Sequence, residues 1–169
     1  MLTGDSAGGN LIISLTLMAI MRKFRVPDAI LPVYPCTICS NETFYPSLLN
    51  AFDDTLLGYT LLFQIAKAYP PKDGPHKMIG STDPYMSPGI CAPDWALAKF
   101  PPTRIMLAGV CPLKDDGLYF FNRLLENGVN AKAYEMKLMP HGFLSYYAPK
   151  VKGLPESGDC IKKAIELLS

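Results

Sequence analysis

Apolar residues recur at helical spacing near the beginning of the chain. Over residues 7–23 the positions of Leu11, Leu15 and Met18 follow one another at intervals of three or four residues, with apolar or small neighbours on most sides. This pattern predicts a helix that packs centrally against a sheet. Basic residues near its end suit the negative pole of the helix dipole, and Pro27 prevents the helix from continuing.

Short, nearly continuous apolar runs predict the strands. The runs 29–34, 104–110 and 130–136 have the composition of parallel strands that are buried on both faces. Pro32 weakens the first of these predictions, because proline cannot donate to a ladder. Residues 1–3 predict only the end of a further strand, which is too short to be complete.

One helix is predicted within the loop-rich segment 40–88. Asp53 or Asp54 can cap it, apolar residues between 57 and 69 give it a buried side, and Pro70 ends it. An exposed loop follows and contains His76, which we interpret as a solvated surface histidine. Residues 83–88 predict a rigid turn.

The C-terminal part of the chain predicts two amphipathic helices. The first begins at Asp115 or Asp116 and stops at Gly128, and its shared apolar face consists of Leu118, Phe121 and Leu125. The second closes the chain, with an apolar side formed by Ile161, Ala164, Ile165 and Leu168. Alternating strands and helices imply right-handed crossovers and a mostly parallel α/β sheet, with ligand sites at the carboxyl ends of the strands.

Composition excludes several classes of protein. A length of 169 residues, 49% of them hydrophobic and 18% charged, suits a compact domain with a core and argues against disorder. The net charge of +1 comes from dispersed charges, so we expect no nucleic-acid or anionic-membrane partner. The longest apolar stretch, 11–21, falls short of the roughly 20 residues that span a bilayer, so no transmembrane segment is expected.

Cysteine usage indicates a reducing compartment. The five cysteines are odd in number and irregularly spaced, which favours free thiols and a cytoplasmic location over a disulfide framework. The nearness of the Ser6 turn to Met1 also leads us to expect no leader peptide. Cys36 and Cys39 have the spacing of a redox or zinc pair, but no second pair accompanies them. We interpret them as small buried or loop residues, and we expect neither a metal nor another cofactor.

A glycine-flanked serine is the strongest chemical signal. Gly4-Asp5-Ser6-Ala7-Gly8 fits Gly-x-Ser-x-Gly, in which a serine is exposed at a tight turn from strand to helix. Small residues around a serine also occur in ordinary turns and helix caps. The context favours a nucleophile, because an apolar helix follows and His141 stands far downstream, at the end of the last predicted strand. A structural loop histidine is the alternative for His141.

Four segments together resemble the hormone-sensitive-lipase family of α/β-hydrolases. They are Gly4–Asn10, Asp83–Pro88, Pro112–Gly117 and Pro140–Phe143, in the order of that family. The resemblance implies a partial α/β-hydrolase fold that lacks its N-terminal strands and occupies 1–169 as a single truncated domain. It also implies a serine esterase or lipase site, with Ser6 as nucleophile, His141 as base and the backbone N–H of Ala7 as an oxyanion donor.

Two features of that family are missing. The family has an aspartate directly before Pro-Leu, where this chain has Cys111, and a neutral thiol is a poor hydrogen-bond acceptor. Asp115 and Asp116 are the nearest carboxylates; they are expected to cap the next helix, although Asp115 could substitute after a loop shift. The glycine-rich oxyanion loop that precedes the nucleophile in the family has no counterpart here.

Two classes of function remain. The first is a serine-type hydrolase of small acyl esters or lipids, with weak or no activity in this form. The second is a non-catalytic remnant of the fold that acts as a binding or interaction domain. Because the expected sheet has an unpaired edge, we also expect self-association or a missing N-terminal half as partner.

Overall fold

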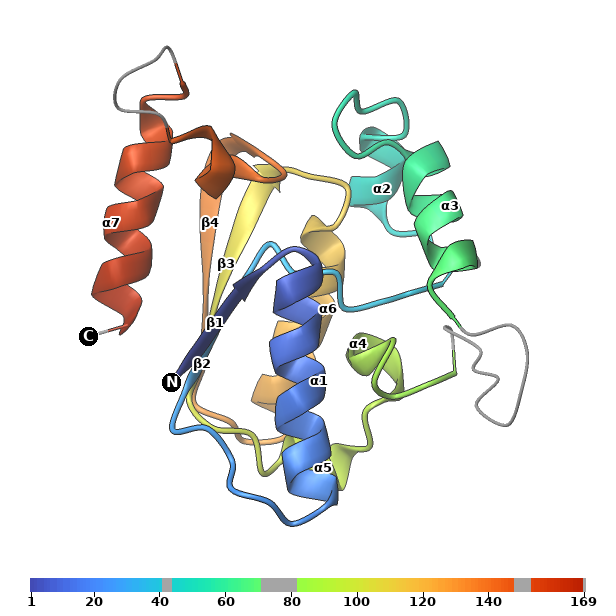
Figure 1. Ribbon diagram of the computed structural model, residues 1–169, viewed down its shortest axis with the longest axis vertical. Helices are drawn as coiled ribbons and strands as arrows, with labels where there is room; N and C mark the ends of the chain where they lie inside the picture. Colours follow the sequence, from blue (N-terminus) through green and yellow to red (C-terminus); the bar gives the residue numbers. More distant parts are fainter. Residues whose placement is uncertain (41–43, 71–81, 148–152, 169) are drawn as a thin grey trace.

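A parallel sheet with strand order β1-β2-β3-β4 forms the centre of the structure (Figure 1). The structure is a computed structural model and describes residues 1–40, 44–70, 82–147 and 153–168. Its strands are β1 (Leu2–Asp5), β2 (Ile30–Val33), β3 (Thr103–Val110) and β4 (Ala131–Pro140). All the predicted strands are therefore confirmed, and β4 extends beyond residue 136 to the residue before His141. His76 lies outside the described residues.

Pro32 lies inside β2, despite its missing N–H. The pairing of β2 with β3 is formed at Ile30 with Thr103 and at Val33 with Met106, and Pro32 falls between these two points. On its other side, Pro32 stands opposite Gly4 of β1. The ladder thus accommodates proline at a place where its neighbours supply the hydrogen bonds.

Helix α1 (Ala7–Met21) begins directly after the Ser6 turn and confirms the predicted central helix. It buries Ile13, Leu17 and Ile20 against the sheet. Leu11 and Leu15, which define the apolar pattern in the sequence, are instead 56% and 53% exposed. Because α1 is apolar on most sides, its composition predicted a helix but not which side would be buried.

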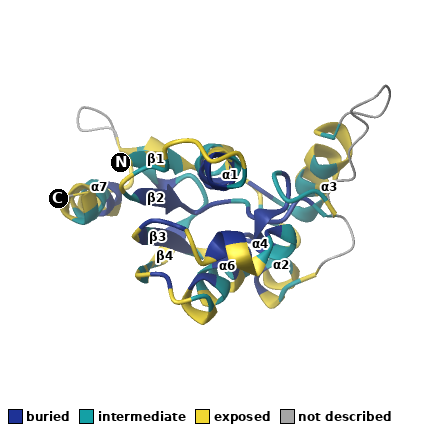
Figure 2. Ribbon diagram, turned by 90° about the horizontal axis from the view of Figure 1, so that it is seen from below, coloured by how far each residue is buried: buried dark blue, intermediate teal, exposed yellow. Residues whose placement is uncertain are grey.

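The helices form layers on the two faces of the sheet. Figure 2 places α1 and α6 (Lys114–Glu126) on one face and α7 (Glu156–Leu168) on the other. Between β2 and β3 the chain forms α2 (Pro46–Asn50), α3 (Tyr59–Ala68), α4 (Pro88–Cys91) and α5 (Asp94–Leu97). After β4, a short 3-10 helix, η1 (Phe143–Tyr146), leads toward α7.

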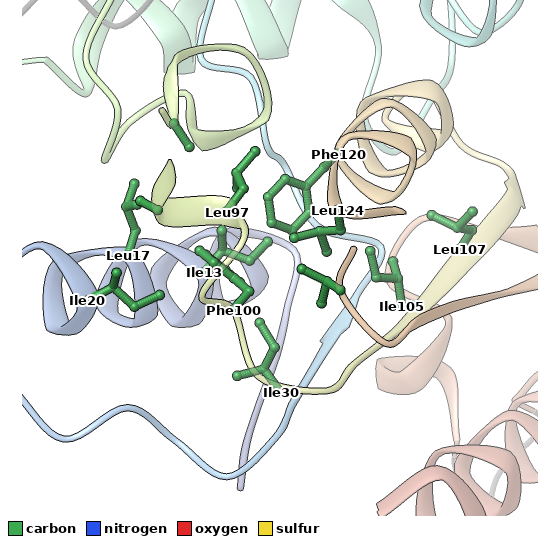
Figure 3. Packing of buried hydrophobic residues seen from close by; sticks show 13 residues of the cluster. Ile13, Leu17, Ile20, Ile30, Leu97, Phe100, Ile105, Leu107, Phe120 and Leu124 are labelled. Carbon is green, nitrogen blue, oxygen red and sulfur yellow. The ribbon is translucent and has the colours of Figure 1, made fainter. Parts of the chain in front are cut away.

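The main core lies between the sheet and the helices α1, α5 and α6 (Figure 3). Phe120 and Leu124 of α6 meet Ile105 of β3 there, and all of these side chains are fully buried. A second apolar cluster fills the opposite face and reaches the carboxyl ends of the strands, where it includes Cys111 and Phe143.

The segment between β2 and β3 contains more helix than predicted. Two helices, α2 and α3, occur where the sequence predicted one within 40–88, and α4 and α5 follow from Pro88 onward. Helix α3 begins after Gly58, not at Asp53 or Asp54. Asp54 instead accepts hydrogen bonds from the backbone N–H groups of Leu56 and Leu57, which makes it the first residue of a turn. The turn predicted at 83–88 is present, because Asp83 accepts from the next two available N–H groups, at Tyr85 and Met86.

Helix α6 is rotated relative to the prediction. Its buried apolar residues are Phe120 and Leu124, with Leu118 and Phe121 partly buried, whereas Leu125 is 47% exposed. Leu113 occupies the N-cap position without a side-chain hydrogen bond, so neither Asp115 nor Asp116 caps the helix; both lie in its first turn. Gly128 adopts a positive φ of 75° just after α6, as expected for a helix stop.

Helix α7 is also present but faces the sheet differently from the prediction. Its inward side consists of Ser157, Cys160, Ala164 and Leu167, while Ile165 is 61% exposed. No helix within the described ranges is long and apolar enough to cross a membrane.

Candidate active site

Ser6 occupies a strained turn between β1 and α1. Its φ of 53° and ψ of −118° lie in a region that residues with side chains rarely adopt, and such strain is typical of functional positions. A side chain at Gly4 would collide with the backbone carbonyl of Gly8, and a Cβ at Gly9 would lie 2.8 Å from that of Pro35. The glycines therefore allow α1 to start against the sheet, and the turn presents the Ser6 hydroxyl at the sheet edge.

His141 is brought to Ser6 by the length of β4. The strand ends at Pro140, and the Nε2 atom of His141 lies 2.8 Å from the Oγ atom of Ser6. The two residues are 135 positions apart in the sequence. Because both follow parallel strands, the carboxyl-edge rule alone brings them to the same edge of the sheet.

Cys111 contacts the other side of the imidazole ring. It follows β3 directly, and its Sγ atom lies 3.2 Å from His141 Nδ1. The backbone N–H of Leu113 donates to the same sulfur at 3.3 Å. Burial raises the pKa of the Cys111 thiol to about 12, so the sulfur carries a proton at neutral pH. The hydrogen-bond chain is thus Ser6, His141 and Cys111, and it ends in a neutral group.

The imidazole is neutral in this environment. Burial lowers the pKa of His141, and the negative charges of Asp5 and Asp54 partly oppose that effect. A neutral ring with a free nitrogen at this distance can accept the serine proton. The same burial makes the protonated ring unfavourable unless an anion lies nearby.

The carboxylate of Asp115 holds helix α2. It accepts the backbone N–H of Ser47 at 2.8 Å, and the Asp115 N–H donates to the Ser47 hydroxyl at 3.1 Å. The Ser47 hydroxyl in turn donates to the carbonyl of Pro112. The structure therefore brings Asp115 to α2 and not to His141. A cavity of about 240 Å³ lies in this region, and its lining includes Ser47, Asn50, Cys111 and Asp115.

Asp116 is buried in the first turn of α6. Burial raises its pKa well above the ordinary value for a carboxyl, while the backbone N–H of Ile38 opposes that shift. Cys36 and Cys39 lie near it, and all five cysteines of the chain are free. Burial likewise raises the pKa of the Cys36 thiol. Among the described residues, the side chains of Asp116, Cys36 and Cys39 have no hydrogen bond to the side chains of Ser6 and His141, although the backbone N–H of Cys36 donates to the Ser6 carbonyl at 3.4 Å.

Tyr34 is a site residue that the sequence analysis missed. It follows β2, its side chain is almost completely buried, and its ring centre lies 4.9 Å from that of His141. Its hydroxyl donates to Asp5 Oδ2 at 3.2 Å, and Phe143 packs edge-on against its other side at 4.7 Å. The carboxyl-edge rule that placed Ser6, Cys111 and His141 would also have placed Tyr34, because it is the last residue of the strand predicted over 29–34 and directly follows the observed β2.

Ala7 is the first residue of α1, so its backbone N–H has no acceptor within the helix. This position suits the predicted oxyanion donor. Such a donor acts on the negative oxygen that forms when a carbonyl is attacked.

A family model described as alpha/beta hydrolase fold matches residues 1–145. An esterase of Gibberella moniliformis is 31% identical over 144 residues, which make up 84% of this chain and 43% of the esterase. A hormone-sensitive lipase of Mus musculus is 43% identical over 68 residues, 40% of this chain and 9% of the lipase.

A solved esterase structure has a similar fold over nearly the whole chain. Carboxyl esterase 2 of the mycorrhizal fungus Tuber melanosporum superposes with a TM-score of 0.80 at 29% identity, over 96% of this chain and 50% of its own. The chain thus spans about half the length, or less, of these relatives.

Proposed function

Because this chain belongs to the hormone-sensitive-lipase family of α/β-hydrolases, we propose that it carries a serine-type carboxylic-ester hydrolase site with Ser6 as nucleophile and His141 as base. The observation that carries the proposal is the 2.8 Å separation of Ser6 Oγ and His141 Nε2 at the strained turn. The esterases among its relatives support the reaction class.

The reaction proceeds in two halves. The Ser6 oxygen attacks the ester carbonyl carbon while His141 Nε2 takes the hydroxyl proton, and the carbonyl oxygen becomes an oxyanion facing the N–H of Ala7. The carbon–oxygen bond to the alcohol breaks, and the alcohol leaves with the proton from His141. Water then attacks the carbonyl carbon of the acyl-Ser6 ester while His141 Nε2 takes one of its protons. The bond between the acyl carbon and the Ser6 oxygen breaks, His141 returns the proton to that oxygen, and the acid is released with the serine hydroxyl restored.

Cys111 makes this site weak. For Nε2 to accept a proton, the ring hydrogen must be on Nδ1 and must be donated to Cys111 Sγ, which already accepts the N–H of Leu113. An ionised aspartate only accepts and therefore fixes this tautomer, whereas a thiol can also donate its own proton to Nδ1. The thiol also adds no negative charge beside the imidazolium that forms during attack.

We propose small acyl esters or lipid esters as the substrates. The esterases among the relatives support a substrate of this class. The neutral thiol at the acid position favours a second candidate, a binding module of the same fold in which Ser6 and His141 no longer turn over an ester.

Labelling with a fluorophosphonate separates the two candidates. The reagent should modify Ser6 in the natural sequence, and labelling should disappear in Ser6→Ala and His141→Ala. Ser145→Ala is the matched control, since Ser145 is an exposed serine in η1, close to His141 in the sequence, and its removal should change nothing. Labelling that persists in Ser6→Ala would refute the nucleophile, and a wholly unlabelled protein would favour the binding module.

A further inference from the structure

The groups that face His141 come from every strand end around it. Ser6 and Asp5 come from the end of β1, Tyr34 from the end of β2 and Cys111 from the end of β3; Asp54 acts from the turn before α3. Of these groups, Asp5 and Asp54 are the carboxyl groups, and their negative charges favour the protonated form of His141. An imidazolium formed at His141 must therefore be stabilised by a carboxylate other than one at position 111.

Tyr34 links one of these carboxylates to the ring. Its ring contacts the imidazole at a tilt of 59°, with 4.9 Å between the ring centres, and its hydroxyl donates to Asp5 Oδ2 at 3.2 Å. Tyr34 is itself held in place, because its backbone N–H donates to Met106 at 2.6 Å and Phe143 packs against its ring. A buried and fixed side chain thus joins the carboxylate next to the nucleophile to the ring of the base.

We propose that Asp5, held by the Tyr34 hydroxyl, is a positioning residue that stabilises the protonated form of His141 in place of an acid at position 111. The inference rests on the proposed function for its role in turnover. Its electrostatic part, the coupling of Asp5 to His141, is measurable whether or not an ester is cleaved.

Asp54 is the weaker candidate for this role. Its Oδ1 atom already accepts two backbone N–H groups, from Leu56 and Leu57, which spread its charge into the turn. It has no hydrogen bond to a side chain that touches the imidazole among the described residues.

Asp5 is exposed to solvent, so its effect on His141 is moderate and is screened by salt.

The direct test is the titration of the imidazole by NMR in the intact chain. The protein contains two histidines, and His76→Gln assigns the signals. Asp5→Asn should lower the pKa of His141 and leave that of His76 unchanged. Tyr34→Phe keeps the ring but releases the carboxylate, so it should lower the His141 pKa in the same direction, and Asp5→Glu should retain most of the natural value.

A kinetic measurement accompanies the titration. The rate of Ser6 phosphonylation at neutral pH should fall about twofold to fivefold in Asp5→Asn, the range expected for an exposed charge pair. The loss should shrink at high salt, which a purely structural role of Asp5 would not produce. Asp28→Asn is the matched control, because Asp28 is an exposed acid paired with Arg25 before β2, at the opposite end of that strand.

The outcomes are distinct. An unchanged His141 pKa in Asp5→Asn, or an equal shift in Asp28→Asn, overturns the inference. A lowered pKa together with a complete lack of labelling in the natural sequence upholds the coupling and refutes the esterase. A lowered pKa with slower, salt-sensitive labelling supports both.

Discussion

In the proposed mechanism, a single side chain, Cys111, decides how well the imidazole of His141 can act as a base. The thiol is 3% exposed and lies 3.2 Å from Nδ1, so its geometry is that of an acid partner while its charge is not. A hydrogen bond to an ionised group is roughly twice as strong as a neutral one. The site therefore keeps the arrangement of a charge-assisted chain without its last charge.

Replacing Cys111 by aspartate should increase the phosphonylation of Ser6. The carboxylate would fix the Nδ1–H tautomer and stabilise the imidazolium; removal of the equivalent charge from a serine protease lowers turnover by about 10⁴-fold. We expect a gain of at least about tenfold, because the adjoining cavity leaves room for a second oxygen. The measurement is the labelling rate of Cys111→Asp against that of the natural protein.

Two further variants serve as controls for this experiment. Cys111→Ser, which stays neutral, should show no gain, and Cys111→Asp combined with Ser6→Ala should not label. If Cys111→Asp labels no faster while Asp115→Asn abolishes labelling, the neighbouring carboxylate performs the role.

The pH dependence of labelling should follow the neutral imidazole. Burial lowers the pKa of His141 below its ordinary value of 6.5, so the ring remains a base at pH 6.5 and loses that form only at lower pH. The labelling rate should therefore hold through pH 6.5 and decline at more acidic pH. Protonation also opposes folding, so the free energy of unfolding falls over the same interval. A midpoint above 6.5 would contradict the burial effect.

Asp116→Asn should stabilise the protein at neutral pH. Burial raises the pKa of Asp116, so the folded state becomes less stable as pH rises from the ordinary carboxyl value of 3.8 through the raised folded value. Asparagine removes this charge and still offers an oxygen to the Ile38 N–H. Denaturant unfolding should show a higher midpoint for the variant at neutral pH and no gain in acid. Asp115→Asn, one residue away, breaks a charge-assisted bond to α2 and should lower the midpoint instead.

At the scale of elements, α6 should depend on the residues that actually face the sheet. Phe120 is fully buried, and Phe120→Ala should cost about 3 to 5 kcal/mol through lost burial and a cavity. Leu125→Ala, on the exposed side of the same helix, should change the free energy of unfolding by less than about 0.5 kcal/mol. Equal losses of unfolding free energy at both positions would instead support the buried face predicted from the sequence, which includes Leu125.

The sequence predicted elements better than their orientation, for a physical reason. The spacing of apolar residues shows that a segment is helical, but α1 is apolar on most sides. In α6 and α7, exposed apolar residues such as Leu125 and Ile165 widen the apolar side beyond the part that is buried. Which face of each helix is buried is then decided by how the helix packs against the sheet. The grouping of Ser6, Cys111 and His141 was easier to predict, because each follows a strand and parallel strands end at one edge. Tyr34 was missed because its apolar ring resembled a core residue.

At the scale of the whole molecule, α1 and the β1 edge leave apolar surface uncovered. Leu15 and Phe24 line a groove of about 450 Å³ beside Leu2, and β1 pairs with β2 alone in the part of the chain that the structure describes. Contiguous apolar surface and an unpaired edge favour association. We expect a concentration-dependent increase in mass in sedimentation experiments.

Charged substitutions test which surface associates. Leu15→Lys with Phe24→Lys should shift the protein toward the monomer. Ile165→Lys, at an equally exposed apolar position on α7 across the sheet, should not. A monomer at all concentrations in the natural protein would contradict the prediction.

Because α7 follows the strands in the sequence, the order of synthesis leaves one face of the sheet uncovered for a time. Helix α7 contacts β2 and η1 and contributes Cys160, Ala164 and Leu167 to the second apolar cluster, on the face opposite α1 and α6. The four strands β1 to β4 and the residues Ser6, Cys111 and His141 leave the ribosome before α7 does. Until α7 emerges, Leu31, Val33 and Met106 of the growing chain lack their helix cover, and this is the interval in which a chaperone that binds apolar strands would have its target.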